Sequence, residues 1–351
     1  MKTELCKIGA LLSDGTPDTS DAEILDRAAA ILRSGGLVAF PTETVYGLGA
    51  NALDAEAAKK IYAAKGRPSD NPLIIHIADI ADAEKYCYTN ALYLRLAERF
   101  LPGPLTVILP KRDCIPLAVT SGLDTVAVRL PSDPTARELI RRAGIPIAAP
   151  SANRSGKPSP TSAAHVLEDM DGRIEMIIDG GECKIGLEST IVSINGDSVT
   201  LLRPGGITVE MLEEICPVKI DKVITEKLSD GERPLAPGMK YRHYAPDTKV
   251  VLLDGSDESI AKFIRNETER TQIGVILSDS DAHLAANTGA KLLTYGDDDM
   301  SEAHNLFSLL RSVDRLGCTV IYARLPDKKG IGLAVYNRIL KAAGYEILKL
   351  E

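Results

Sequence analysis

The stretch that decides the fold of this chain reads KGRPSDNPLIIHI and spans residues 65–77. It continues a helical pattern over 54–65 and ends in an aliphatic run over 73–77, which predicts a short strand. Gly66 lies between the two patterns, and a glycine after the last helical turn lets the chain change direction. The stretch therefore predicts a helix followed at once by a strand, a basic unit of α/β proteins.

Strand-like aliphatic runs recur on both sides of this unit, and helical patterns separate some of them but not all. A capping box over 20–23 precedes one helical pattern, which Gly35 and Gly36 close. Asp133 and Pro134 start another. This uneven alternation predicts an α/β fold with a twisted mixed sheet. The expected strands of this region lie over 37–40, 73–77, 105–109, 125–130, 145–149, 176–179, 190–194 and 199–202.

Composition changes after this region, where prolines, glycines and mixed charges surround the segment APGMKYRHYAP and periodicity is lost. Beyond it, strands alternate with helices, as in a smaller doubly wound, Rossmann-like α/β domain. Those strands are expected over 250–253, 273–277, 291–294 and 319–323. We therefore divide the chain into a first domain over 1–216, an ordered linker over 217–248 and a C-terminal domain over 249–351.

Composition and charge fit a folded globular protein. Of 351 residues, 44% are hydrophobic and 26% are charged. The net charge of −8 disfavours a protein whose whole surface binds nucleic acid, although a local basic groove over 129–173 stays open. No apolar run approaches the ~20 residues of a membrane helix, and the run over 8–12 is too short for the core of a signal peptide. The six cysteines form no CxxC pair, so neither a disulfide framework nor a zinc site is indicated. A cytoplasmic protein without a membrane partner is the expectation.

Two cations flank the glycine of the opening stretch. Lys65 and Arg67 repel each other at this spacing, so a fold that fixes both favours an anion such as a triphosphate between them. The alternative is a pair of solvated surface cations. His76, within an aliphatic run, is more typical of a half-buried histidine than of a catalyst.

Hydroxyl groups follow the first expected strand, in the segment PTETVYGLGANA. Period-two geometry places Thr42, Thr44 and Tyr46 on one face of an extended segment, where they can line a polar pocket. The tail GLGANA also matches the dinucleotide fingerprint GxGxxA, with Asp70 at the distance of a ribose contact. We reject that interpretation, because no strand leads directly into the glycines and no helix follows them directly.

Small polar groups follow a second strand, in the segment APSANRSGKPSPTS. Ser151 and Asn153 come just after the strand over 145–149, where hydroxyl and amide groups are well placed to bind a ligand in an α/β crevice. Gly156 and Lys157 suggest a P-loop, but the upstream glycine that a P-loop requires is absent. An ordinary loop rich in serine, proline and glycine is the alternative.

A third pair of residues lies at the two ends of an expected hairpin: Ser189 in GLESTIVSI and Arg203 in LLRPGG. Arg203 either points at a phosphate or caps the turn. The sequence contains no nucleophile elbow, no HExxH and no paired-carboxylate pattern. A cationic, hydroxyl-rich inventory suits phosphoryl or nucleotidyl transfer, in which the protein positions substrates and neutralises charge.

Together, the segments PTETVYGLGA, KGRPSDNPLIIHI, PSAN and PGMKYRHYAP closely resemble the YrdC-domain family, specifically its long form, the threonylcarbamoyl-AMP synthases. The resemblance covers essentially the whole chain, and its specificity lies in the joint order of the segments. It implies a YrdC-like catalytic domain, a linker that closes over the active site and a C-terminal α/β domain. For that last domain we expect a steric role, in which it gates the pocket together with the linker. The same resemblance implies a nucleotidyltransferase that makes threonylcarbamoyl-AMP and pyrophosphate from L-threonine, bicarbonate and ATP, for threonylcarbamoyladenosine in tRNA.

The resemblance also implies roles for individual residues. The catalytic cations would be Lys65 and Arg67. The residues that would hold L-threonine are Thr44, His76, Arg129, Ala149 and Ser189. The residues that would hold ATP are Lys65, Arg67, Asn71, Thr125, Ser151, Asn153, Ser159, Arg203 and either Tyr241 or Tyr244. No protein ligand to a metal is implied, because Mg²⁺ would bind through the ATP phosphates.

Partners and rival functions follow from the same resemblance. Downstream partners would be tRNA threonylcarbamoyl-transfer proteins, with direct contact to RNA also open. One rival is carbamoyl transfer to another acceptor, as in larger hydrogenase-maturation proteins that contain a YrdC domain. Another is a double-stranded RNA-binding module, which the acidic balance disfavours.

Overall fold

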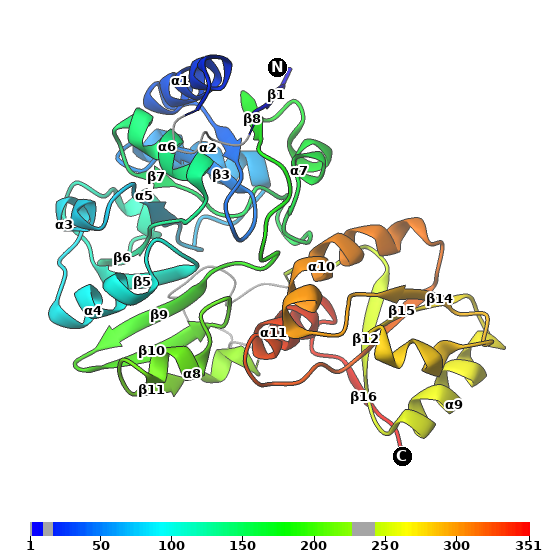
Figure 1. Ribbon diagram of the computed structural model, residues 1–351. Helices are drawn as coiled ribbons and strands as arrows, with labels where there is room; N and C mark the ends of the chain where they lie inside the picture. Colours follow the sequence, from blue (N-terminus) through cyan, green and yellow to red (C-terminus); the bar gives the residue numbers. More distant parts are fainter. Residues whose placement is uncertain (1, 10–16, 227–242) are drawn as a thin grey trace.

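The computed structural model describes residues 2–9, 17–226 and 243–351, which form two α/β units, each built on its own sheet (Figure 1). The larger sheet has eleven described strands in the order β1-β8-β2-β3-β7-β4-β6-β5-β9-β10-β11. Their bounds are β1 (Glu4–Lys7), β2 (Val38–Phe40), β3 (Gly47–Asn51), β4 (Ile74–His76), β5 (Leu105–Pro110), β6 (Thr125–Arg129), β7 (Ile147–Ala148), β8 (Met176–Asp179), β9 (Thr190–Asn195), β10 (Ser198–Arg203) and β11 (Val218–Ile220). The helices of this unit are α1 (Thr19–Arg33), α2 (Ala55–Lys65), α3 (Ala83–Tyr86), α4 (Ala91–Phe100), α5 (Leu117–Thr120), α6 (Pro134–Ala143), α7 (Ala163–Met170) and α8 (Val209–Glu213), with 3₁₀ turns η1 (Ile80–Asp82) and η2 (Lys222–Ile224).

The smaller sheet has five described strands in the order β14-β13-β15-β12-β16, and all its pairs are parallel. Its strands are β12 (Lys249–Asp254), β13 (Ile273–Leu277), β14 (Lys291–Thr294), β15 (Val320–Arg324) and β16 (Ile347–Lys349). Its helices are α9 (Asp257–Thr268), α10 (Asp299–Ser312) and α11 (Gly332–Ala342), with 3₁₀ turns η3 (Ser280–Ala285) and η4 (Val313–Arg315). The larger sheet mixes parallel and antiparallel pairs, so the predicted fold class is confirmed for both sheets.

The opening stretch forms the expected helix, turn and strand. The Asp54 side chain caps α2 by accepting from the backbone N–H of Glu56, and Gly66 ends the helix with a left-handed φ of 62°. Ile61 of α2 is fully buried against the sheet. The following strand, β4, runs parallel to β6 and antiparallel to β7, so this unit lies at the centre of the larger sheet.

The sequence predictions differ from the structure at several places. The cap of α1 is Asp18, whose side chain accepts from the N–H of Asp21, so the predicted capping box over 20–23 is wrong. The expected strand over 145–149 is reduced to Ile147–Ala148. Part of the expected linker, at Val218–Ile220, pairs with β10 as an edge strand of the larger sheet.

The two units share a hydrophobic cluster and pack closely. Val45 and Leu187 of the larger unit lie in one buried cluster with Phe307 of α10 and Val335 of α11, the two helices that face the larger unit (Figure 1). A side chain at Gly186 would meet the backbone of α10, because its Cβ would lie 2.5 Å from the carbonyl oxygen of His304. Within the described residues, no helix has both the length and the apolar character needed to cross a membrane.

The turn after β10 offers a test of close backbone packing within the larger unit. A Cβ at Gly205 would lie 2.5 Å from the backbone nitrogen of Thr190 and 2.6 Å from the carbonyl oxygen of Glu188, and backbone atoms cannot move aside as a side chain can. We expect Gly205→Ala to lower the free energy of unfolding by about 1–3 kcal/mol, the usual cost of overpacking. Urea unfolding followed by circular dichroism measures it.

Gly206 supplies the matched control for this substitution. A Cβ at this position meets only side-chain atoms, at 3.1 Å from Pro104 Cγ and 3.3 Å from Ile185 Cδ1, which can yield by a few tenths of an ångström. We expect Gly206→Ala to cost clearly less than Gly205→Ala. Equal unfolding midpoints for the two variants would contradict this account of the turn.

Candidate functional site

One pocket collects most of the residues that the sequence singled out. It occupies about 590 Å³, counted with its opening to solvent, which is in the usual range for a small-molecule site. Its walls come from the turn after α2, strands β4 and β6, the loop after β7, the end of β10 and the segment before β12. The predicted residues that line it are Arg67, His76, Arg129, Ala149, Ser151, Asn153, Ser159, Arg203 and Tyr244.

Five other predicted residues lie outside this lining. Thr44 is buried and its Oγ1 lies 2.8 Å from Oγ1 of Thr42, which does line the pocket. Ser189 is buried behind Arg203, whose Nη2 donates to its Oγ at 3.1 Å. The other three are Lys65, Asn71 and Thr125. Tyr241 lies outside the described residues.

Lys65 braces a loop rather than facing the pocket. Its Nζ donates to the carbonyl oxygens of Ser151 and Asn153, both at 2.5 Å. Only 4% of Lys65 is exposed, so the alternative of a solvated surface cation is wrong for this residue. Burial, reinforced by the charge of Arg67, lowers the pKa of the Lys65 amine well below its usual value. Direct contact with phosphate stays a prediction.

Arg67 reaches the pocket from the turn after α2. Its Nη2 donates to the carbonyl oxygens of Asn71 and Pro72, both at 3.1 Å, so the turn itself fixes the direction of the guanidinium. Asn71 is itself buried, and its backbone carbonyl helps to orient Arg67. A guanidinium held in this way has a fixed orientation, and its planar shape and permanent charge suit recognition of a phosphate.

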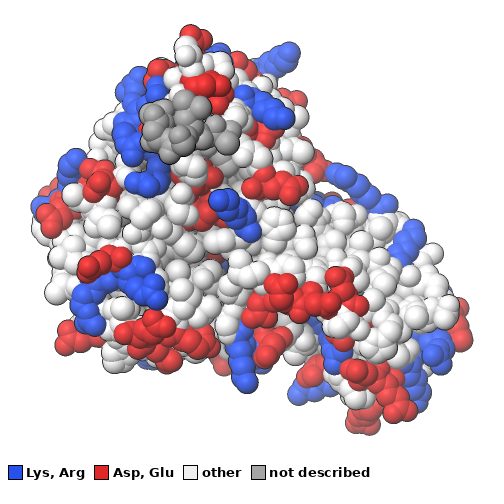
Figure 2. Space-filling view, viewed as in Figure 1, with Lys and Arg blue, Asp and Glu red and all other residues white. Residues whose placement is uncertain are grey.

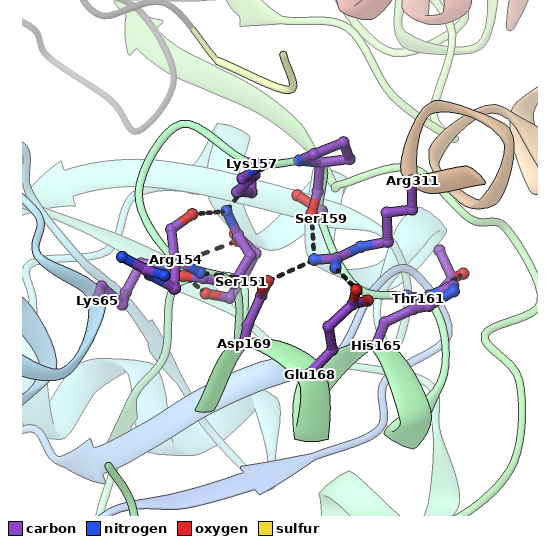
Figure 3. A network of polar contacts seen from close by, with 12 residues as sticks. Lys65, Ser151, Arg154, Lys157, Ser159, Thr161, His165, Glu168, Asp169 and Arg311 are labelled. Carbon is purple, nitrogen blue, oxygen red and sulfur yellow. Dashed lines mark hydrogen bonds and ion pairs between the residues drawn. The ribbon is translucent and has the colours of Figure 1, made fainter. Parts of the chain in front are cut away.

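The loop over 151–159 is held on two sides (Figure 3). Lys65 binds its first residues, and within the loop the Asn153 side-chain amide donates to the carbonyl oxygens of Arg154 and Lys157, both at 2.8 Å. From α10, Arg311 donates to the carbonyl oxygen of Pro158 at 2.6 Å. The loop is therefore a fixed part of the wall and not a loose connection.

Arg129 and His76 form another part of the wall, on neighbouring strands in register. Nη2 of Arg129 lies 2.8 Å from Oε1 of Glu43, an ion-pair distance without hydrogen-bond alignment. Nε of Arg129 is buried and has no hydrogen-bond partner among the described residues, so a donor remains for an acidic ligand. Burial, with the charge of Arg129, lowers the pKa of His76 to about 3, so this histidine is neutral at pH 7.

Glu188 is the main functional candidate that the sequence analysis missed. It lines the pocket, and its Oε1 accepts from Ser159 Oγ at 2.5 Å while its Oε2 accepts from Arg338 Nε at 2.8 Å. Burial raises the pKa of this carboxyl, but the charges of Arg338 and Arg203 outweigh it and hold the pKa at about 2. The available signal was an acidic residue placed directly before Ser189.

The segment before β12 covers one side of the pocket. Tyr244 lines it and packs against Phe307 of α10, with ring centroids 5.0 Å apart. The backbone N–H of Ala245 donates to the carbonyl oxygen of Gly156 at 2.9 Å, which ties this segment to the loop over 151–159. His243 also lines the pocket and was missed, although it lies within the predicted motif.

Comparison with known families covers nearly the whole chain. Residues 30–205 match the family model described as "Telomere recombination", which spans Sua5, YciO and YrdC proteins, and residues 207–344 match the model described as "Threonylcarbamoyl-AMP synthase, C-terminal domain".

Individual relatives agree with these matches. The threonylcarbamoyl-AMP synthase of Pyrococcus abyssi is 50% identical over 92% of this chain and 95% of its own length, and that of Bacillus subtilis is 47% identical over 94% and 96%. The crystal structure of P. abyssi Sua5 complexed with L-threonine superposes with a TM-score of 0.88 at 46% identity, covering 99% of this chain and 100% of that one.

Proposed function

Because the chain belongs to the threonylcarbamoyl-AMP synthase family, we propose that it converts L-threonine, bicarbonate and ATP into threonylcarbamoyl-AMP and pyrophosphate. The observation that carries this proposal is the single pocket lined by nine of the predicted residues. The related P. abyssi enzyme, which superposes over the whole chain, binds L-threonine. We assign one end of this pocket to the amino acid and the other end to the nucleotide.

The amino-acid end is the wall formed by β4, β6 and the residue after β7. Arg129 would bind the threonine carboxylate, because its buried Nε has no hydrogen-bond partner in the described part of the chain and a guanidinium matches a carboxylate in geometry and charge. Neutral His76 and the backbone at Ala149 would border the substrate on the same wall. Thr44 and Ser189 do not line the pocket. Each is hydrogen-bonded to a lining residue, Thr44 to Thr42 and Ser189 to Arg203.

The nucleotide end is the wall formed by Arg67, the loop over 151–159 and Arg203. The two guanidinium groups would neutralise phosphate oxygens, and the hydroxyls of Ser151 and Ser159 would supply shorter polar contacts. Tyr244 would close the site over the nucleotide from the side of the C-terminal unit. Asn71 and Thr125 would act at a distance, because neither lines the pocket.

The chemistry fits a site without a protein nucleophile. The threonine amine attacks CO₂ derived from bicarbonate and loses a proton, which gives a carbamate. A carbamate oxygen then forms a bond to the α-phosphorus of ATP as the bond to pyrophosphate breaks, so threonylcarbamoyl-AMP, pyrophosphate and one water result. Holding the two reactants in line removes much of the entropic barrier, and fixed cations stabilise the charge on the leaving group.

We also propose Mg²⁺ as the counter-ion of the phosphates. Glu188, the carboxylate among the described lining residues, is already paired with Arg338, and Glu43 is paired with Arg129. Phosphate oxygens and water would therefore supply the ligands. Bound in this way, Mg²⁺ would supply positive charge for the pyrophosphate leaving group.

The wider setting of the reaction is part of the same proposal. The six cysteines are all free thiols, as expected in a reducing cytoplasm. A labile acyl adenylate needs a nearby acceptor, so downstream partners would be proteins that transfer the threonylcarbamoyl group to tRNA. On the face drawn in Figure 2, acidic and basic side chains alternate over both units, which is unlike the continuous basic surface of an RNA-binding module.

One assay tests the reaction against its rivals. Purified protein is incubated with ATP, labelled bicarbonate, Mg²⁺ and L-threonine, and both pyrophosphate and the carbamoyl adenylate are followed. We expect both products to form only when threonine is present. Turnover without threonine would point to another acceptor, and no turnover by properly folded protein would contradict the proposal.

A further inference from the structure

Arg338 belongs to the C-terminal unit, yet its guanidinium reaches the wall of the pocket. The residue lies on α11, and its side chain is 0% exposed. Nε donates to Glu188 Oε2 at 2.8 Å, Nη2 to the carbonyl oxygen of Pro204 at 2.9 Å, and Nη1 to Asn337 Oδ1 at 2.9 Å. Every nitrogen of this group therefore has an acceptor, and two of the acceptors belong to the larger unit.

Each of those two acceptors adjoins a residue that lines the pocket. The Glu188 carboxylate also accepts from Ser159 Oγ at 2.5 Å, so one carboxylate joins Arg338 to the end of the loop over 151–159. Pro204 directly follows Arg203, whose Nε donates to the carbonyl oxygen of Ser189 at 3.0 Å. A single residue therefore links Arg338 to each of two proposed nucleotide contacts: Glu188 links it to Ser159, and Pro204 links it to Arg203.

The C-terminal unit binds the same loop at a second place. Arg311 of α10 is buried, and its Nη2 lies 2.6 Å from Asp169 Oδ2 and 2.6 Å from the carbonyl oxygen of Pro158 (Figure 3). The same Asp169 oxygen accepts from the backbone N–H of Arg154 at 3.3 Å. The two arginines thus hold the loop from α10 and from α11.

We propose that Arg338 is a positioning residue of the active site: it holds Glu188 as a carboxylate that orients Ser159, and it fixes the turn that carries Arg203. This inference rests on the proposed function, which assigns Ser159 and Arg203 to ATP. It gives the C-terminal unit a role inside the site, beyond the steric closure expected from the sequence.

The charge of Glu188 depends on its neighbours, because the group is buried. With Arg338 present, its pKa is about 2 and the carboxylate stays ionised from pH 5 upward. Without Arg338, burial still raises this pKa while only part of the opposing effect remains, from the charge of Arg203 and the hydrogen bond from Ser159. The pKa of Glu188 is then higher, and its protonation is favoured as the pH falls. The other charged or titratable groups that act on Glu188 or feel its charge are Arg203, Tyr244, His243, Lys65 and Lys341.

Binding of a non-hydrolysable ATP analogue to the full-length protein, measured by calorimetry at pH 8 and pH 6, tests the proposal. Arg338→Met keeps the volume and removes the charge. We expect it to weaken binding about tenfold at pH 8 and about fivefold more at pH 6, relative to the unmodified protein at the same pH. Arg338→Lys, which keeps a cation, should show no added loss at pH 6. Arg315→Met, an exposed arginine of the same unit, should bind as the unmodified protein does.

The double variant Arg338→Met/Glu188→Gln separates the groups that titrate. Lys341 also titrates in this window. Burial and the charge of Arg338 lower the pKa of the Lys341 amine to about 7. If Glu188 is the responsible group, the double variant binds weakly and equally at both pH values. A pH dependence that survives in the double variant assigns the effect to another group and overturns the proposal.

Other outcomes are equally decisive. If Arg338→Met fails to fold, the double variant, which buries no unpaired carboxylate, carries the test: full affinity there would overturn the proposal. An equal loss at both pH values in Arg338→Met would overturn it as well. Because the readout is binding of the nucleotide alone, a protein that binds the analogue but makes no threonylcarbamoyl-AMP would contradict the proposed function and leave this test valid.

Discussion

Replacing Arg67 by Ala is expected to lower kcat by roughly 100- to 1000-fold, the usual effect of removing one fixed donor that stabilises charge in a transition state. Arg67 lines the pocket, and its own turn orients it through the carbonyl oxygens of Asn71 and Pro72. The guanidinium is therefore already in place before ATP arrives, and its loss costs about 3–4 kcal/mol of transition-state stabilisation. Steady-state kinetics at saturating threonine and bicarbonate measure the change.

Two further variants serve as controls for the Arg67→Ala result. Arg67→Lys keeps the charge but loses the planar fork, so it should recover part of the rate and not all of it. Arg141→Ala removes an arginine that is 57% exposed on α6 and should leave the rate within twofold. A rate for Arg67→Ala within threefold of the unmodified protein would remove Arg67 from the site.

The central part of the fold could be predicted because its signals are local. The end of α2, the turn at Gly66 and the strand that follows each depend on residues within a few positions of one another. Strand β3 was not predicted, because its sequence, GLGAN, is poor in strand-forming residues. Close packing by neighbouring side chains requires glycine in this strand. A Cβ at Gly49 would lie 2.8 Å from Phe40 Cε1 and 2.9 Å from Ile147 Cγ2.

In the site, too, the residues that could be predicted depend on local sequence, and those that could not depend on contacts with distant segments. The motif residues on the turn after α2 and on the loop after β7 could be found by type and spacing. The place of Lys65 behind the loop could not, because it depends on carbonyl oxygens 86 and 88 positions later in the chain. The pairing of Glu188 with Arg338 joins residues 150 positions apart, and no pattern in either segment points to the other.

Replacing Arg129 by Met is expected to weaken binding of L-threonine by 100-fold or more. Arg129 is 4% exposed, and truncating one partner of a buried, charged contact typically costs 2–5 kcal/mol, roughly 30- to 4000-fold in affinity. The effect should be confined to the amino acid, because the nucleotide end of the pocket lies on other segments. Calorimetric titration with threonine and, separately, with an ATP analogue measures both.

The same substitution has a second consequence that needs its own control. Without Arg129, the buried Glu43 carboxylate loses the guanidinium 2.8 Å away, and an uncompensated buried charge destabilises a protein by about 3–5 kcal/mol. The double variant Arg129→Met/Glu43→Gln removes that charge, so it should recover most of the stability while threonine binding stays weak. If the double variant regained threonine affinity together with stability, loss of folding would explain the single variant, and Arg129 would not be the carboxylate-binding residue.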